Sequence, residues 1–231
     1  FNALTAAGIA AENYPFCTID PNIGVVLVPD PRLAALATIV KPKQIMPATV
    51  EFVDIAGLVA GASKGEGLGN QFLAHIRETD AIAHVVRCFE HSSVMHVCNR
   101  VDPRSDIETI STELVLADLV TVEKALQRVE KAAKAGGREA LERKAALERV
   151  QAHLDTGSSL RTLLLTDLER EALRDLCLLT GKPMLYIANV AEDDFRANPL
   201  LDQVQEIARQ EDAEVASVCA AIESELAELE D

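Results

Sequence analysis

Short apolar runs alternate with amphipathic segments along most of this chain. Five runs rich in β-branched and aliphatic residues predict five strands, at residues 23–28, 49–54, 81–89, 183–190 and 213–219. Apolar residues at helical spacing predict three helices between them, at residues 32–40, 69–79 and 200–210. Strands that alternate with helices favour an α/β fold with a mainly parallel sheet and helices on both of its faces.

A long helical segment interrupts this alternation. Apolar residues between Ile107 and Leu154 recur at three- and four-residue steps, and the pattern breaks at Gly136-Gly137. This predicts two antiparallel helices joined by a two-glycine turn. A third helix is predicted from the capping-box pattern at residues 166–169 as far as Thr180.

The interruption and the composition together predict the organisation of the protein. We expect residues 1–105 and 175–231 to form one α/β domain and residues 106–174 to form a helical insertion. No apolar run reaches the roughly 18–20 residues that span a bilayer, and the N-terminal sequence lacks the pattern of a secretory signal. The five cysteines are scattered, which fits reduced thiols. We therefore expect a soluble, cytoplasmic protein with no membrane partner.

Charge is distributed unevenly along the chain. The formal net charge is -15, which argues against unspecific nucleic-acid binding by the whole molecule. Residues 124–149 nevertheless contain eight basic and four acidic side chains. Two readings stay open for this segment. It is either a solvated helical face held by ion pairs, or a surface that contacts phosphate backbones through Arg128, Lys131, Lys134 and Arg138.

The end of one predicted strand carries candidate phosphate chemistry. Asp54 ends the strand, and Gly57 follows three residues later. A nucleotide hydrolase uses this order at the γ-phosphate, because an aspartate can hold Mg²⁺ through water and a glycine lets a backbone N–H approach the phosphate. A strand that ends in an ordinary turn gives the same pattern. Thr18, in a loop bounded by Pro15 and Pro21, is a candidate switch threonine, which would bind Mg²⁺ through its hydroxyl.

Two further segments suit the recognition of a nucleotide base. Residues 189–192 read Asn-Val-Ala-Glu, where GTPases have Asn-Lys-x-Asp. Glu192 is one methylene longer than the aspartate that accepts two hydrogen bonds from guanine, so the motif does not predict guanine specificity. Cys219-Ala220-Ala221 follows a predicted strand, and small residues there let backbone N–H groups approach a base. The segments occur in the order typical of P-loop NTPases of the GTPase class.

Taken together, these segments resemble the YchF, or Obg-like, ATPases within the Obg-related P-loop NTPases. The resemblance covers essentially the whole chain and rests on residues 13–19, 52–59, 76–81 and 186–190. It implies a G-domain with a coiled-coil insertion, a preference for ATP over GTP, and association with the ribosome. The partner would be the large subunit or the whole 70S-type particle, with a ribosomal RNA contact through the basic helical hairpin.

The resemblance also assigns roles to single residues. Thr18 and Asp54 look like the Mg²⁺ ligands, and Gly57 looks like the switch glycine beside the phosphate. The base and its surroundings would be contacted by Asn189, Val190, Glu192, Cys219, Ala220 and Ala221. Leu58 stands where Ras-like enzymes place the glutamine that orients the attacking water. An apolar side chain can neither donate nor accept a hydrogen bond, which predicts slow hydrolysis.

Two elements of the family pattern do not occur within this sequence. The phosphate loop Gly-x-x-x-x-Gly-Lys-Ser/Thr would precede Phe1, and the small TGS domain would follow Asp231. We therefore expect the chain to be a fragment that is inactive by itself, taken from an active ATPase. Two alternatives stay open: a GTPase of the Obg type, and a non-catalytic ribosome-binding scaffold on a degenerate NTPase fold.

Overall fold

The computed structural model describes residues 1–5, 22–55, 68–91, 100–134, 136–193, 195 and 197–229. The chain divides into two compact units. Unit 1 comprises residues 1–57 and 221–231, and unit 2 comprises residues 58–220. Each unit is described by itself below.

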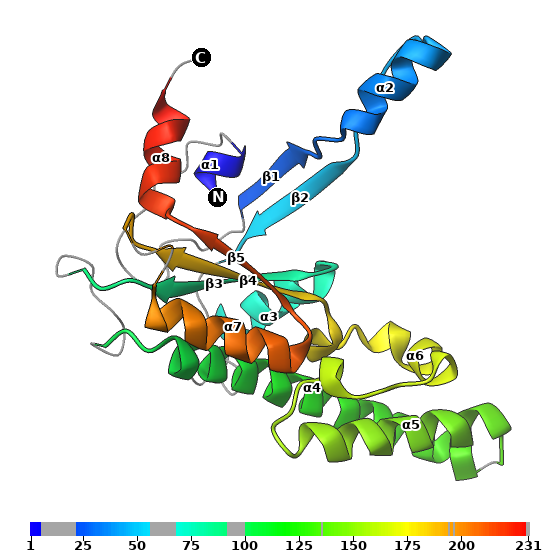
Figure 1. The fold of residues 1–231 in the computed structure, drawn as a ribbon. Helices are drawn as coiled ribbons and strands as arrows, with labels where there is room; N and C mark the ends of the chain where they lie inside the picture. The colour runs from blue at the N-terminus through cyan, green and yellow to red at the C-terminus, as the bar shows by residue number, and fades with distance from the viewer. Residues whose placement is uncertain are drawn as a thin grey trace. The chain divides into compact units, whose positions relative to one another are not determined.

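Unit 1 contains a two-stranded antiparallel ribbon. Strands β1 (Asn22–Leu27) and β2 (Thr49–Asp54) pair so that Asn22 lies opposite Asp54. Helix α2 (Pro31–Val40) lies between them in the sequence, with Asp30 as its N-cap. It has no buried residue and extends beyond the end of the ribbon (Figure 1), so it does not cross over to make the two strands parallel.

The start of the chain packs against this ribbon. Helix α1 (Asn2–Thr5) contacts β1 at Gly24. A Cβ atom at Gly24 would overlap the Cγ2 atom of Thr5, closer than two non-bonded carbon atoms can approach. The close approach of α1 therefore requires glycine at this position. The last helix, α8 (Ala220–Glu228), begins at the final residue of unit 2.

Unit 2 is built on a three-stranded parallel sheet in the order β3-β4-β5. The strands are β3 (Ile82–Cys88), β4 (Met184–Val190) and β5 (Glu214–Val218). Helix α7 (Pro199–Glu211) connects β4 to β5, and helix α3 (Leu68–Glu78) precedes β3. Alternate residues of β3 and β4 point into one core. Helix α7 and the first turns of helix α4 (Pro103–Lys134), which contains Ile107, cover this core. This core contains Val86, Cys88, Tyr186, Ala188, Val190, Val204 and Ile107.

The predicted helical hairpin is present in unit 2. Helix α4 (Pro103–Lys134) and helix α5 (Arg138–Leu154) pack along each other (Figure 1). Gly136, in the turn between them, has a φ of 82°, which only glycine adopts without strain. The hairpin has its own apolar core, formed mainly by Val115, Val122, Val129, Leu147, Val150 and Leu154. Helix α4 begins three residues before the predicted start of the insertion, and the division into domains stays a prediction.

The predicted third helix of the insertion is only partly present. The capping box at Thr166 forms, because the Thr166 side chain accepts from the Glu169 N–H and the Glu169 carboxylate accepts from the Thr166 N–H. Helix α6, however, covers only Asp167–Leu173, and two 3-10 turns follow, η2 (Arg174–Leu176) and η3 (Leu179–Gly181). The expected helix to Thr180 is wrong, because Cys177 adopts a left-handed conformation with a φ of 46° and stops the helical path.

Among the described helices, none combines the length and the hydropathy that a bilayer crossing would need.

Candidate functional site

The carboxyl edge of the parallel sheet holds the predicted base-recognition residues. Asn189 is the second-last residue of β4, and its side-chain oxygen accepts a hydrogen bond of 3.0 Å from the backbone N–H of Ala220. This bond joins the end of β4 to the first residue of α8, across the end of β5. Ligands of open α/β sheets bind at this edge of the sheet. One side chain therefore positions both predicted base-contacting segments.

Burial limits what the neighbouring side chains can contact. Val190 is only 2% exposed and Cys219 only 4%, so both side chains belong to the protein interior. If these two residues contact a nucleotide, they do so through their backbone groups. Glu192, Ala220 and Ala221 are exposed. The exposed carboxylate of Glu192 can accept hydrogen bonds from an amino group of a base.

A buried asparagine that the sequence analysis missed supports the same edge. The Asn198 Nδ2 donates to the Cys88 carbonyl at 2.8 Å, and its Oδ1 accepts from the N–H groups of Leu200 and Leu201 at 2.9 and 3.2 Å. Asn198 thus caps α7 and ties it to the end of β3. The pair Asn198-Pro199 is a typical helix start, so its capping role could have been predicted. No local sequence pattern predicts its hydrogen bond to the Cys88 carbonyl, because the two residues are far apart in the sequence.

Cys88 is a structural thiol and not a reactive one. Its side chain is fully buried in the sheet core. Burial, and to a smaller extent the charge of Asp106, raises the pKa of the Cys88 thiol to about 11. A thiol with this pKa stays protonated near neutral pH, which disfavours nucleophilic or metal-binding chemistry.

The predicted phosphate-side residues are only partly described. Asp54 is the last residue of β2, in unit 1, and its side chain is half-buried. A carboxylate at a strand end has the donor chemistry that Mg²⁺ prefers, so Asp54 fits its predicted role. Thr18, Gly57 and Leu58 lie outside the described residues. The described base-side residues Asn189 to Ala220 belong to unit 2.

The basic residues of the helical hairpin fall into two groups. On α5, basic side chains form ion pairs of 2.5–2.8 Å, which join Arg138 to Glu142, Arg143 to Asp175, Lys144 to Glu148 and Arg149 to Glu169. On α4, the side chains of Lys124, Gln127, Arg128 and Lys131 line a surface hollow.

The ion-pair interpretation of this segment therefore applies to α5, and the residues of α4 stay candidates for the phosphate contact. Lys124, Arg128, Lys131 and Lys134 make no ion pair with any residue in the described ranges, and their spacing places them on one face of α4. We call these four residues the basic face. Arg138, which the sequence analysis grouped with them, is instead paired with Glu142 within α5.

Comparisons with known proteins identify the family. Residues 1–132 match the protein family described as 50S ribosome-binding GTPase, which is more than half of the chain. The chain belongs to this family. Membership of the 50S ribosome-binding GTPases agrees with the parallel sheet and helices of unit 2 and confirms the predicted α/β fold of the P-loop NTPase type.

Curated relatives confirm the resemblance to YchF. The chain is 60% identical over 231 residues to the Ribosome-binding ATPase YchF of Haemophilus influenzae and 51% identical over 233 residues to that of Bacillus subtilis. Each alignment covers 100% of this chain and 64% of the relative. The chain therefore spans less than two thirds of the length of these relatives.

A solved structure is similar over the same extent. The Schizosaccharomyces pombe YchF GTPase superposes with a TM-score of 0.78 at 35% sequence identity, covering 100% of this chain and 64% of that one. The bacterial relatives are named ATPases and the yeast relative is named a GTPase. The names of the relatives thus agree on nucleotide hydrolysis and differ on the nucleotide. The individual site residues, the Mg²⁺ ion and the domain boundaries stay predictions.

Proposed function

We propose that this chain is part of a cytoplasmic, ribosome-associated switch that binds ATP with Mg²⁺ and hydrolyses it slowly. The observation that carries the proposal is the hydrogen bond between Asn189 and the Ala220 N–H. It holds the Asn-x-x-Glu turn against the start of α8 at the edge of the sheet where ligands bind. The relatives named Ribosome-binding ATPase YchF support the choice of ATP and of the ribosome as partner.

The choice of ATP over GTP rests on Glu192. A glutamate carboxylate reaches one methylene farther than the aspartate of a guanine-reading motif, so the pair of hydrogen bonds to guanine loses its geometry. The carboxylate can instead accept from the single exocyclic amino group of adenine. The second candidate is a GTPase, which the name of the yeast relative favours.

Slow hydrolysis follows from the residues predicted at the phosphate. Asp54 and Thr18 would hold Mg²⁺, whose charge offsets that of the phosphates when it is bound. Leu58 would stand where other enzymes orient the attacking water, and its side chain has no hydrogen-bonding group. Without that group, the full-length protein needs another residue, a cation or a partner to hydrolyse ATP rapidly.

The basic face of α4 is the proposed ribosome contact. Its cations are exposed and make no ion pair with the described residues, so a partner's phosphate groups can bind them without displacing an internal partner. The family description, which names the 50S ribosome, supports ribosomal RNA of the large subunit as the source of those phosphates.

ATP turnover by the full-length protein tests the proposal. We expect ADP and phosphate to form far more slowly than about 10 per second without a partner, and faster when ribosomes are added. Turnover above this rate without ribosomes would contradict the slow switch. If the full-length protein neither binds nor hydrolyses any nucleotide, it is the non-catalytic scaffold instead.

A further inference from the structure

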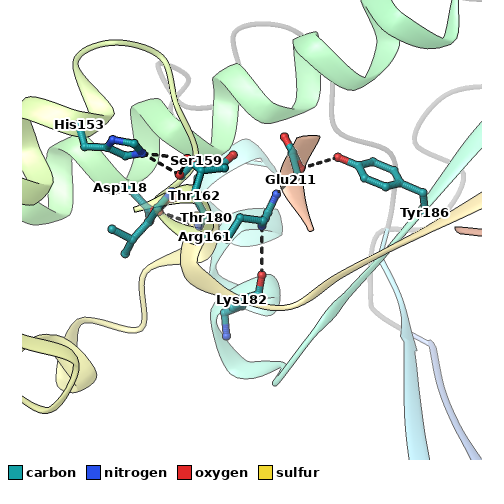
Figure 2. Close-up of polar contacts among 10 residues, drawn as sticks. Asp118, His153, Ser159, Arg161, Thr162, Thr180, Lys182, Tyr186 and Glu211 are labelled. Atoms are coloured by element: carbon teal, nitrogen blue, oxygen red, sulfur yellow. Dashed lines mark hydrogen bonds and ion pairs between the residues drawn. The ribbon is translucent and has the colours of Figure 1, made fainter. Parts of the chain in front are cut away.

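A buried carboxylate ties the middle of helix α4 to the segment that leads back into the sheet. Asp118 is 0% exposed, and its two oxygens accept hydrogen bonds of 2.8 Å from the N–H groups of Leu179 and Thr180. The Thr180 hydroxyl donates a third bond of 2.7 Å, and it accepts from the Leu160 N–H at 3.2 Å. Figure 2 shows this cluster. We call residues 179–182 the junction.

The junction also holds the end of helix α3. The ammonium group of Lys182 donates to the carbonyl of Arg77 at 3.0 Å and to the carbonyl of Thr79. These carbonyls lie at the C-terminal end of α3, where the helix leaves its last oxygen atoms without internal partners and where positive charge is favourable. The Arg77 guanidinium in turn donates to the Thr121 hydroxyl of α4 at 3.1 Å. Helices α3 and α4 are thus linked both through the junction and directly.

A third set of contacts joins the junction to the sheet. Arg161 donates through Nε to the Lys182 carbonyl at 3.4 Å and through Nη1 to the Glu211 carboxylate at 2.8 Å. Tyr186, in β4, donates its hydroxyl to the same carboxylate at 2.8 Å (Figure 2). The side chains of Arg161 and Glu211 are only 9% and 17% exposed, so this ion pair is well shielded from water. Arg161 and Glu211 therefore connect the junction to strand β4 of the sheet.

The two links of the junction differ in strength. Separating Asp118 from residues 179–180 would leave a buried carboxylate and two buried N–H groups without partners, which costs several kcal/mol. Helix α4 and the junction should therefore move together. Lys182 is a point charge on a flexible four-carbon stem, and it can release or regain carbonyl partners at much lower cost. The bond between Lys182 and α3 is thus the adjustable link.

We propose that the junction couples α3 to α4, so that a nucleotide-dependent displacement of α3 is carried through Lys182 and Asp118 into the helical hairpin. The proposal rests on the proposed function, because α3 follows the predicted phosphate-binding residues Asp54 and Gly57 in the sequence. The hairpin carries the basic face, so the coupling would let the state of the nucleotide set the orientation of the ribosome contact. Lys182 is then a positioning residue for the partner and not for the chemistry.

Hydrogen exchange in the full-length protein tests the coupling. Exchange is measured without nucleotide, with ADP and with a non-hydrolysable ATP analogue, in the wild type, in Lys182→Met and in Arg143→Met. Methionine keeps the length of the Lys182 stem and removes its charge. Arg143→Met is the matched control, because it removes the ion pair of Arg143 with Asp175, which joins α5 to η2 and involves no residue of the junction.

The wild type should respond to the nucleotide at three places. We expect exchange to change at residues 185–192, in α3, and by at least about threefold in α4. In Lys182→Met the first two responses should remain and the response of α4 should be clearly reduced, because only the direct bond between Arg77 and Thr121 still links α3 to α4. Arg143→Met should behave as the wild type does.

The outcomes separate this proposal from the proposed function. If α4 responds equally in Lys182→Met, or does not respond in the wild type while residues 185–192 do, the coupling is wrong and the nucleotide site stands. If residues 185–192 do not respond to either nucleotide, the proposed function fails, and the coupling that rests on it fails with it.

Discussion

The side-chain oxygen of Asn189 accepts the backbone N–H of Ala220 at a distance of 3.0 Å. The two residues are far apart in the sequence, and the bond brings the end of β4 to the start of α8. The predicted base-recognition motif and the predicted small-residue segment therefore form one local structure. Because the bond lies at the protein surface, its loss should weaken the binding of a nucleotide base and hardly change the stability of the core.

Replacing Asn189 should weaken nucleotide binding. In Asn189→Ala the Ala220 N–H loses its partner, and the two segments lose their common position. We expect the Kd of the full-length protein for ATP to rise by at least about tenfold, equal to about 1.4 kcal/mol. Titration calorimetry measures this change. Ser217→Ala, on the adjacent strand β5 and exposed, is the control and should bind ATP as the wild type does.

Replacing Asp118 should destabilise the protein strongly. Asp118→Ala leaves the buried N–H groups of Leu179 and Thr180 without an acceptor, and we expect a loss of about 3 kcal/mol in the free energy of unfolding. Thr180→Val removes the hydroxyl that donates to Asp118 and accepts from the Leu160 N–H, and it should cost less, about 1–2 kcal/mol. Urea denaturation of the two variants compares them. Equal losses would contradict the assignment of Asp118 as the centre of the cluster.

The pH dependence of stability should carry a signature of His84. Burial, and then the charge of Arg161, lowers the pKa of His84 from 6.5 to about 4. The His84 Nδ1 atom is buried and has no partner within the described residues, and its ring packs against Tyr186, whose hydroxyl binds Glu211. Below pH 6.5 the unfolded chain therefore binds a proton that the folded chain does not. Stability falls as the pH is lowered from about 6.5 to about 4, by up to about 3 kcal/mol.

The variant His84→Phe isolates this effect. It keeps an aromatic ring beside Tyr186 and cannot titrate, whereas other groups, including Asp118, titrate in both proteins. The difference in unfolding free energy between wild type and variant should change with pH over this range and stay constant above pH 7. A difference that does not depend on pH would show that His84 is protonated as easily in the folded protein as in the unfolded chain.

The two groups of basic residues should respond differently to neutralisation. Arg128→Gln removes a cation of the basic face, and it should weaken ribosome co-sedimentation. The slope of the logarithm of the binding constant against the logarithm of the salt concentration should decrease in magnitude by about 1. Arg138→Gln removes a cation that already pairs with Glu142, and it should have a much smaller effect. Equal effects of the two substitutions would contradict the assignment of the ribosome contact to α4.

The elements of the fold could be predicted from the sequence because their signals are local. Alternating apolar runs gave the strands, and the two-glycine turn gave the hairpin of α4 and α5. The break after α6 could not be predicted, because Cys177 adopts a left-handed conformation that its residue type does not favour. The antiparallel pairing of β1 with β2 was also missed, since it depends on α2 extending away from the ribbon.

The junction shows where sequence reasoning ends. Asp118 lay on the same helical stripe as Leu114 and Val122, which are buried, so a buried carboxylate could have been suspected there. Its partners are about sixty residues away, and no local pattern identifies them. Lys182 likewise reads as an ordinary surface lysine before a proline, and only the fold places it at the end of α3.

The most direct test is a titration of the full-length protein with ATP and with GTP in the presence of Mg²⁺. The account predicts that ATP binds at least about tenfold more tightly than GTP, because Glu192 replaces the aspartate of the guanine-reading motif. Binding of GTP tenfold more tightly than ATP would contradict it and identify the protein as a GTPase of the same fold.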